Sequence, residues 1–294
     1  MLATKRLPGD AWLELGDVEI APVDGRRDGV EVLIVAGDVV DDAVLDRLPS
    51  LRLVANYGVG YDKVDVEACR ARGVAVTNTP GVLDAATADL AIALLLAVRR
   101  RVVEGDSAVR AGGFGGAWSE TPFLGRDLAG ATLGIVGLGR IGSAVRQRAL
   151  AFDMRVVFTR SAASEDECYR SLDDLLREAD AVSVHAPLTP ETRGLLSRER
   201  LALLRDGATL VNTARGPIVD EDALVAELVS GRISAGLDVF THEPHVPEAL
   251  WALPNVVLTP HIGSATVETR AAMTRVVVDN VLALGRGEAL LTPV

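Results

Sequence analysis

The sequence predicts an α/β protein with two doubly wound parallel sheets, and three observations lead to this prediction. Short apolar runs alternate with helical patterns along the 294 residues, which is typical of βαβ units. A glycine-rich turn at Gly137–Gly142 follows an apolar strand and opens a helix, as in many α/β domains. More than a hundred residues precede this turn, which is enough chain for part of another domain.

The N-terminal part of the chain has the pattern of one parallel sheet. Strands are expected at Val32–Val35, Leu53–Ala55 and Val74–Thr77, with helices at Asp42–Leu48 and Val64–Arg72. A long helix is predicted to start near Asp84 or Thr87 and to carry the apolar residues 88–98 into the polar residues 99–110. This helix is expected to lead from one domain to the next.

The glycine-rich turn has the context that dinucleotide binding requires. It lies between a predicted strand, Thr132–Val136, and a predicted helix, Ile141–Phe152. In such a motif Gly137 allows a tight turn, Gly139 lets main-chain amides approach a pyrophosphate, and Gly142 lets the helix pack close to the strand. The N-terminus of the helix then faces the anion. The motif therefore predicts a dinucleotide site at this turn.

The part of the chain from the glycine-rich turn onward is predicted to form a second sheet. Strands are expected at Thr132–Val136, Val156–Phe158, Ala181–His185, Thr209–Asn212, Ser234–Leu237 and Val256–Leu258. Helical patterns separate these strands, so a doubly wound sheet is expected. The apolar spacing of Val267–Leu284 predicts a final helix that ends near Gly285.

Composition excludes several classes of function. The hydrophobic content of 49% supplies a core, and the net charge of -11 disfavours a nucleic-acid partner. The most apolar run, Leu90–Val98, is too short to span a bilayer, and the first ten residues lack a signal core. Cys69 and Cys168 are isolated and lack the spacing of metal ligands. We therefore expect a cytoplasmic protein with no metal site and no membrane partner.

Several motifs occur together along the chain and are more specific in combination than any one of them. They are Asn56–Asp62 (NYGVGYD), Gly137–Gly142 (GLGRIG), His185–Thr192 (HAPLTPET), Val211–Pro217 (VNTARGP), Gly236–Phe240 (GLDVF) with Glu243-Pro244, and Leu258–Thr266 (LTPHIGSAT). This combination resembles the D-isomer-specific 2-hydroxyacid dehydrogenase family over almost the whole chain. The resemblance implies that a dinucleotide-binding domain, residues 95–266, is inserted into a substrate domain, residues 1–94 and 267–294.

The resemblance implies a catalytic triad of Arg215, Glu243 and His261. Reduction of a 2-keto acid needs a cation for the carboxylate, a proton donor for the carbonyl oxygen and a correctly held hydride donor. Arg215 offers a planar fork suited to carboxylate and carbonyl oxygens. His261 is expected to be the acid in reduction and the base in oxidation. Glu243 is expected to hold the imidazole and to favour its protonated form.

The resemblance also implies how substrate and cofactor are bound. The amides of Gly58, Val59 and Gly60 are expected to meet a substrate carboxylate, together with Arg215, and Ser264 is expected near the reacting centre. The implied cofactor residues are Thr87, Gly137, Gly139, Arg140, Ile141, Gly142, Thr159, Arg160, Ser161, His185, Pro187, Thr192, Thr213, Ala214, Arg215, Asp238, His261 and Gly263. Substrate selectivity is expected from loops such as Phe114–Trp118.

The end of the second strand of the dinucleotide unit departs from the usual NAD pattern. NAD sites place an acidic residue about 20 residues past the glycine-rich turn, where it binds the ribose 2′-hydroxyl. Here the sequence has Thr159, Arg160 and Ser161 instead. A cation flanked by two hydroxyls suits a 2′-phosphate, so NADP(H) is the expected cofactor. An exposed arginine at a strand end, with NAD(H) still used, is the alternative.

The motifs look most like those of glyoxylate/hydroxypyruvate reductases, which implies NAD(P)H-dependent reduction of a small 2-keto acid to the D-2-hydroxy acid. An NAD-dependent D-3-phosphoglycerate-type dehydrogenase is one alternative. A scaffold similar to NAD(P)-sensing corepressors, with little turnover, is another alternative. Measured turnover distinguishes an enzyme from such a scaffold. A homodimer paired around the helix of residues 88–110 is expected from the family, although its apolar stretch Leu90–Val98 could equally be an internal core helix.

Overall fold

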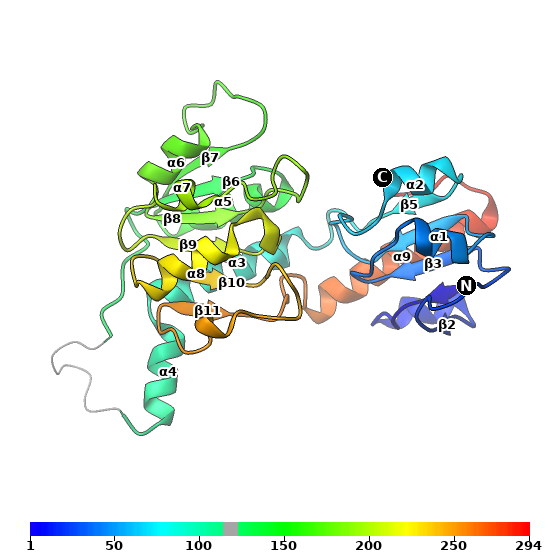
Figure 1. Cartoon of the computed structure of the whole chain (residues 1–294), viewed down its shortest axis with the longest axis horizontal. Helices are drawn as coiled ribbons and strands as arrows, with labels where there is room; N and C mark the ends of the chain where they lie inside the picture. Colours follow the sequence, from blue (N-terminus) through cyan, green and yellow to red (C-terminus); the bar gives the residue numbers. More distant parts are fainter. Residues whose placement is uncertain (114–122) are drawn as a thin grey trace. The chain divides into compact units, whose positions relative to one another are not determined.

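The computed structural model describes residues 1–113 and 123–294 and divides into two compact units. The first unit contains Met1–Ala86 and Ser264–Val294, and the second contains Thr87–Gly263 (Figure 1). The boundaries expected from the sequence, at 94/95 and 266/267, lie a few residues further along the chain. In the structure the first boundary falls inside helix α3 (Asp84–Arg99), near its start.

The first unit is built on a five-stranded parallel sheet with the strand order β2-β1-β3-β4-β5. Its elements are β1 (Leu2–Ala3), η1 (Asp10–Leu15), β2 (Glu19–Ile20), β3 (Val32–Val35), α1 (Asp42–Arg47), β4 (Leu53–Asn56), α2 (Val66–Ala71), β5 (Ala75–Thr77) and α9 (Val267–Arg286). This order is that of a flavodoxin-like doubly wound sheet, as expected. The strands β1 and β2 are absent from the sequence prediction because two residues carry no readable alternation.

The second unit is built on a six-stranded parallel sheet with the strand order β11-β10-β9-β8-β6-β7. Its strands are β6 (Thr132–Val136), β7 (Arg155–Thr159), β8 (Ala181–Val184), β9 (Thr209–Asn212), β10 (Ser234–Leu237) and β11 (Val256–Leu258). Its other elements are α4 (Val102–Arg110), α5 (Arg140–Ala151), α6 (Leu172–Glu178), α7 (Arg198–Leu201), η2 (Gly216–Ile218), α8 (Glu221–Val229) and η3 (Glu248–Leu250). The strand order reverses between β6 and β8, and ligands of such sheets bind at this switch point.

The long helix predicted over residues 88–110 is interrupted in the structure, which corrects that prediction. The helix α3 ends at Arg99, and Arg101 has a left-handed backbone with φ 53° before α4 begins. The main-chain oxygen of Arg99 accepts a hydrogen bond from the Arg126 amide at 2.7 Å. The buried Arg99 guanidinium also donates to the main-chain oxygens of Asp127 and Asp180. These tertiary bonds end the helix where the apolar pattern alone predicts continuation.

The apolar stretch of α3 belongs to the core of the second unit. Ala91, Ile92, Leu94 and Leu95 are between 1% and 6% exposed and pack with residues of β6 and α5. The helix α4 differs, because none of its residues is buried and it extends away from the sheet (Figure 1). Of the two interpretations of Leu90–Val98, the structure therefore supports the internal core helix.

Candidate active site

The glycine-rich turn lies at the switch point, between the end of β6 and the start of α5. Gly137 has φ 98°, and a Cβ there would lie 2.7 Å from the Ala186 nitrogen, so only glycine fits. A Cβ at Gly142 would lie 2.2 Å from the Gly137 oxygen. Gly139, the N-cap of α5, has open space where its Cβ would point. The turn thus leaves its open side at the helix N-terminus, which fits a dinucleotide pyrophosphate.

The ends of β7 and β8 flank this turn and carry further residues named from the sequence. The Gly137 amide donates to the Thr159 oxygen at 2.9 Å, and the His185 amide donates to the Val136 oxygen at 2.7 Å. Arg160 follows β7 directly and is exposed. No ion pair of Arg160 occurs within residues 1–113 and 123–294. This cation is therefore available at the strand end, and residues 160–164, which follow β7 directly, contain no carboxylate.

His185 is half-buried at the end of β8 and is electrically neutral at physiological pH. Its Nε2 lies 2.7 Å from the buried Ser183 hydroxyl. Burial lowers the pKa of His185 from 6.5 to about 4, because the charged imidazolium loses its hydration there. In the turn that follows, the Thr192 hydroxyl donates to the Pro187 oxygen at 2.6 Å and fixes the shape of residues 187–192.

A histidine and a glutamate from two different loops form a hydrogen-bonded pair. His261 Nδ1 lies 2.9 Å from Glu243 Oε2, and the side chains are 47% and 30% exposed, respectively. Glu243 follows β10, and His261 follows β11. The other Glu243 oxygen, Oε1, accepts from the Phe240 amide at 3.1 Å. The pair leaves the second ring nitrogen of His261 at an accessible position, which is the geometry of an imidazole that transfers a proton.

The buried Asp238 carboxylate organises the loop that carries His261. Asp238 Oδ1 accepts from the Thr259 hydroxyl at 2.6 Å and the Ile262 amide at 2.8 Å, and Oδ2 accepts from the Gly263 amide at 2.8 Å. Burial raises the pKa of Asp238, and these hydrogen bonds oppose the rise. A Cβ at Gly263 would lie 3.3 Å from Asp238 Oδ2 and 3.4 Å from Thr87 Cγ2. Thr87, Asp238 and Gly263, three of the residues expected to bind the cofactor, are thus neighbours.

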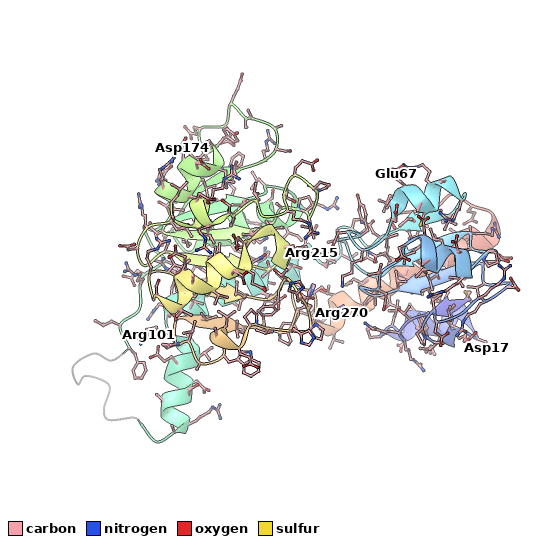
Figure 2. All side chains as sticks on the ribbon, in the orientation of Figure 1. Asp17, Glu67, Arg101, Asp174, Arg215 and Arg270 are labelled. Atoms are coloured by element: carbon pink, nitrogen blue, oxygen red, sulfur yellow. The ribbon has the colours of Figure 1, made fainter. Side chains whose placement is uncertain are left out.

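Arg215 follows β9, and the buried Asn212 fixes the main chain around it. Asn212 Nδ2 donates to the Arg215 oxygen at 2.9 Å, and Asn212 Oδ1 accepts from the Ala214 amide at 3.0 Å. The Arg215 guanidinium donates through Nη1 to the Ala214 oxygen at 2.7 Å, and Figure 2 places Arg215 at the edge of the second unit. The buried Thr213 hydroxyl has no hydrogen-bond partner in the described chain. Such an orphaned polar group at the carboxyl end of β9 fits a bound ligand.

The first unit contains the glycine loop named for the substrate carboxylate. Asn56 Nδ2 donates to the oxygens of Gly58 and Gly60, both at 3.0 Å, and Asn78 Nδ2 donates to the Val59 oxygen at 2.9 Å. The Val59 and Gly60 amides have no acceptor among residues that the structure describes. The Gly58 amide donates to the Asn56 oxygen at 3.0 Å, so the Val59 and Gly60 amides are the ones left to bind an anion. Ser264 begins the returning segment of this unit.

Four residues with no role expected from the sequence hold the main chain of a candidate site: Asn56, Asn78, Asn212 and Glu221. Asn56 and Asn212 are the last residues of buried strands β4 and β9, a position at which polar residues of α/β proteins gather. The segment Phe114–Trp118, named for selectivity, lies outside the described residues. Within the described chain, no helix is long and apolar enough to cross a membrane.

The fold and the site define a class of protein: a dinucleotide-dependent oxidoreductase with an imidazole–carboxylate pair at the carboxyl edge of its sheet. Residues 92–263 match the model of the D-isomer specific 2-hydroxyacid dehydrogenase NAD binding domain. The chain is 47% identical to the glyoxylate reductase of Pyrococcus furiosus over 290 residues, which covers 95% of this chain and 86% of that protein. The chain therefore belongs to the D-isomer specific 2-hydroxyacid dehydrogenases, a family of NAD(P)-dependent enzymes.

Two solved structures extend the comparison to the whole fold. A protein from Thermus thermophilus is 49% identical, with a TM-score of 0.92, and the match covers 100% of this chain and 99% of that chain. The NADPH-dependent glyoxylate/hydroxypyruvate reductase of Sinorhizobium meliloti, solved with NADP and malonate, is 38% identical with a TM-score of 0.91. That match covers 100% of this chain and 95% of the other.

Proposed function

We propose that this protein reduces a small 2-keto acid of the glyoxylate/hydroxypyruvate type to the D-2-hydroxy acid, with NADPH as the preferred cofactor. The observation that carries the proposal is the His261–Glu243 pair, which holds an imidazole 2.9 Å from a carboxylate beside the Arg215 segment. The names of the relatives support this substrate class, since both a 47% identical and a 38% identical protein are glyoxylate reductases.

In this proposal the three residues of the triad have different tasks. His261 donates a proton to the carbonyl oxygen of the keto acid through the ring nitrogen that Glu243 does not hold. Glu243 fixes the orientation of the ring and stabilises its charged form by an opposite charge. Arg215 binds the keto acid and stabilises the negative charge that grows on the carbonyl oxygen. The nicotinamide cofactor supplies the hydride when bound.

We propose that the amides of Val59 and Gly60 bind the substrate carboxylate, while Gly58, whose amide donates to the Asn56 oxygen at 3.0 Å, shapes the loop. Ser264 belongs to the same proposal as a residue near the reacting centre. The proposed cofactor residues are those named from the motifs: Thr87, Gly137, Gly139, Arg140, Ile141, Gly142, Thr159, Arg160, Ser161, His185, Pro187, Thr192, Thr213, Ala214, Arg215, Asp238, His261 and Gly263. Within this set, Arg160 supports the preference for NADPH, because it is an exposed cation at the end of β7.

We also propose a homodimer and a cytoplasmic location. The helix α4 supports the dimer, because Val102, Val103 and Val109 are between 48% and 57% exposed and no α4 residue is buried. A partner subunit that packs on this helix would remove its valines from water. The two cysteines are free thiols, which suits a reducing compartment. Light scattering tests the dimer, since a mass of 31.0 kDa would contradict it.

A panel of keto acids with both cofactors tests the proposed function. Glyoxylate, hydroxypyruvate, pyruvate and a phosphorylated hydroxypyruvate are each measured with NADPH and NADH. We expect the highest kcat/KM for glyoxylate or hydroxypyruvate with NADPH. Cofactor binding without turnover would favour a scaffold that senses the dinucleotide. Preference for the phosphorylated substrate with NADH would favour a phosphoglycerate-type dehydrogenase.

A further inference from the structure

Two consecutive amides ahead of Glu243 are held by two different glutamates. The Phe240 amide donates to Glu243 Oε1 at 3.1 Å, and the Thr241 amide donates to Glu221 Oε1 at 2.8 Å. Glu243 Oε2 lies 2.9 Å from His261 Nδ1. One carboxylate therefore bridges its own loop and the imidazole, so its position depends on the orientation of the main chain at Phe240.

The peptide between Phe240 and Thr241 is enclosed by Gly216 as well as by Glu221. A Cβ at Gly216 would lie 2.1 Å from the Phe240 carbonyl carbon and 2.4 Å from the Thr241 nitrogen, so no side chain fits there. Gly216 follows Arg215 directly in the sequence. This peptide is therefore the point where the segment of Arg215 meets the loop of Glu243.

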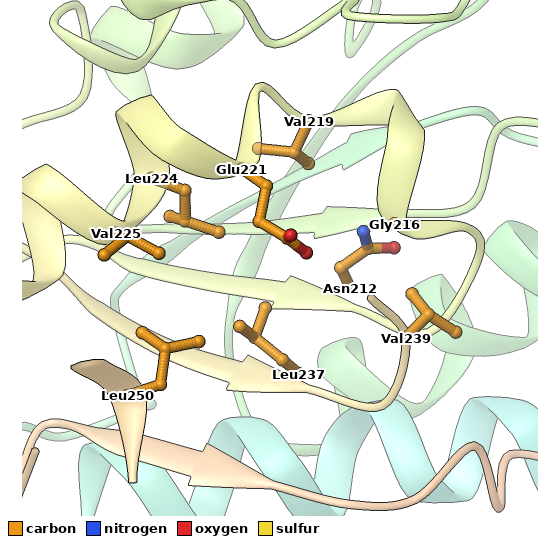
Figure 3. Close-up of a pocket in the computed structure, with 9 residues that line it drawn as sticks. All are labelled: Asn212, Gly216, Val219, Glu221, Leu224, Val225, Leu237, Val239 and Leu250. Carbon is orange, nitrogen blue, oxygen red and sulfur yellow. The ribbon is translucent and has the colours of Figure 1, made fainter. Parts of the chain in front are cut away.

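Glu221 reaches this peptide from a fixed position. It is the first residue of α8, and the start of that helix is capped by Asp220, which accepts from the Ala223 amide at 3.0 Å. Glu221 is half-buried and lines a small pocket with Asn212 and Gly216 at the carboxyl ends of β9 and β10 (Figure 3). A helix start that is capped and packed against the sheet holds a side chain in a defined place.

We propose that Glu221 is a positioning residue for the acid–base pair. By accepting the Thr241 amide, it fixes the peptide that directs the Glu243 carboxylate toward His261. The inference rests on the proposed function, because it concerns the geometry of that reaction. Glu221 acts through Glu243 and contacts neither substrate nor cofactor in this proposal. The role requires a hydrogen-bond acceptor for the Thr241 amide, and it does not require a negative charge at residue 221.

Three variants separate this role from a general effect on folding. Glu221→Ala removes the acceptor for the Thr241 amide. Glu221→Gln keeps an oxygen at the same reach but removes the charge. Asp222→Ala is the matched control, because Asp222 is an exposed carboxylate in the same first turn of α8. It removes the same favourable charge at the helix N-terminus as Glu221→Ala does.

We expect Glu221→Ala to lower kcat for keto-acid reduction about three- to tenfold, because the pair loses its alignment. The KM for the keto acid and the Kd for NADPH should change by no more than about twofold. Glu221→Gln should restore kcat to within about twofold of the wild type, and Asp222→Ala should match the wild type.

Each other outcome has a defined meaning. If the wild type turns over and Glu221→Ala keeps wild-type kcat, the positioning role is wrong while the proposed function stands. If Glu221→Gln is as impaired as Glu221→Ala, charge rather than the acceptor matters, and the proposal is overturned. If Asp222→Ala is equally impaired, the effect belongs to the helix start and the proposal also fails. If the wild type reduces no keto acid, the proposed function fails first and this inference fails with it.

Discussion

His261 is held in a left-handed backbone conformation by Asp238. The φ angle of His261 is 54°, its amide donates to the Asp238 main-chain oxygen at 2.9 Å, and the Asp238 carboxylate accepts from the next two amides. Left-handed backbone is uncommon for a residue with a side chain and costs about 1 kcal/mol or more. The bonds from Asp238 keep this conformation in place at the residue to which we assign proton transfer.

Replacing His261 with alanine should separate chemistry from binding. The variant lacks the proposed proton donor, so kcat for reduction should fall by roughly 10²–10⁴-fold, while NADPH still binds through the other proposed cofactor residues. Steady-state kinetics and fluorescence titration of NADPH measure the two effects. His245→Ala is the matched control, since His245 is an exposed histidine in the neighbouring loop. Near-wild-type turnover of His261→Ala would remove His261 from the mechanism.

Replacing Glu243 with glutamine should lower turnover. The carboxylate lies 2.9 Å from His261 Nδ1 and orients the imidazole. Glutamine loses the charge-assisted part of this hydrogen bond, so kcat for reduction should fall about tenfold. Steady-state kinetics of Glu243→Gln and of the exposed control Glu248→Gln test this. Wild-type kcat in Glu243→Gln would contradict the assigned role.

Replacing Arg160 with alanine should weaken NADPH far more than NADH. A charge-assisted contact to the 2′-phosphate contributes about 1.5–3 kcal/mol, so the Kd for NADPH should rise roughly tenfold or more. Titration of both cofactors against Arg160→Ala measures the ratio directly. Arg198→Ala serves as control, because Arg198 is an exposed arginine on α7. A wild type that prefers NADH in kcat/KM would show that Arg160 is only a surface residue.

His185 should make the protein less stable as the pH falls. Its pKa is lowered from 6.5 to about 4 in the folded state, so the unfolded chain binds the proton first. The neutral form contributes its full stability above pH 6.5, and this contribution is lost between pH 6.5 and about 4, by up to about 3 kcal/mol.

Urea unfolding of the wild type and His185→Gln at about pH 7 and about pH 4.5 tests this pH dependence. Glutamine keeps a polar partner for the Ser183 hydroxyl but does not titrate. The wild type should lose more stability than His185→Gln over this range, because the carboxylates that lose charge are common to both proteins. Equal losses in the two proteins would show that His185 is not the group responsible.

The strands could be predicted closely because their burial is encoded locally. The expected strands Val32–Val35 and Thr132–Val136 have the same bounds in the structure, where every residue of both is buried. A buried parallel strand is a continuous apolar run, which the sequence displays without help from the rest of the fold. The break after Arg99 could not be predicted in this way, because it depends on hydrogen bonds to Arg126, Asp127 and Asp180.

In the candidate site, too, the sequence identifies residues but not their contacts. The motifs identify His261 and Glu243, but their 2.9 Å contact joins two residues that are 18 positions apart in the chain. Glu221 contacts the Thr241 amide, which is 20 residues away in the chain, and no motif position marks it. A side chain that acts on a distant main-chain amide leaves no local pattern, so its role becomes visible only in the folded structure.

The proximity of Thr87 to Gly263 has a consequence for how this chain is assembled. These are the first and last residues of the second unit, and a Cβ on Gly263 would lie 3.4 Å from Thr87 Cγ2. The inserted segment thus leaves and rejoins its host at one place. A module whose ends meet can be added to a host chain, or removed from it, without stretching either part. Residues 87–263 therefore have the form of a domain that a single gene insertion could add to another protein.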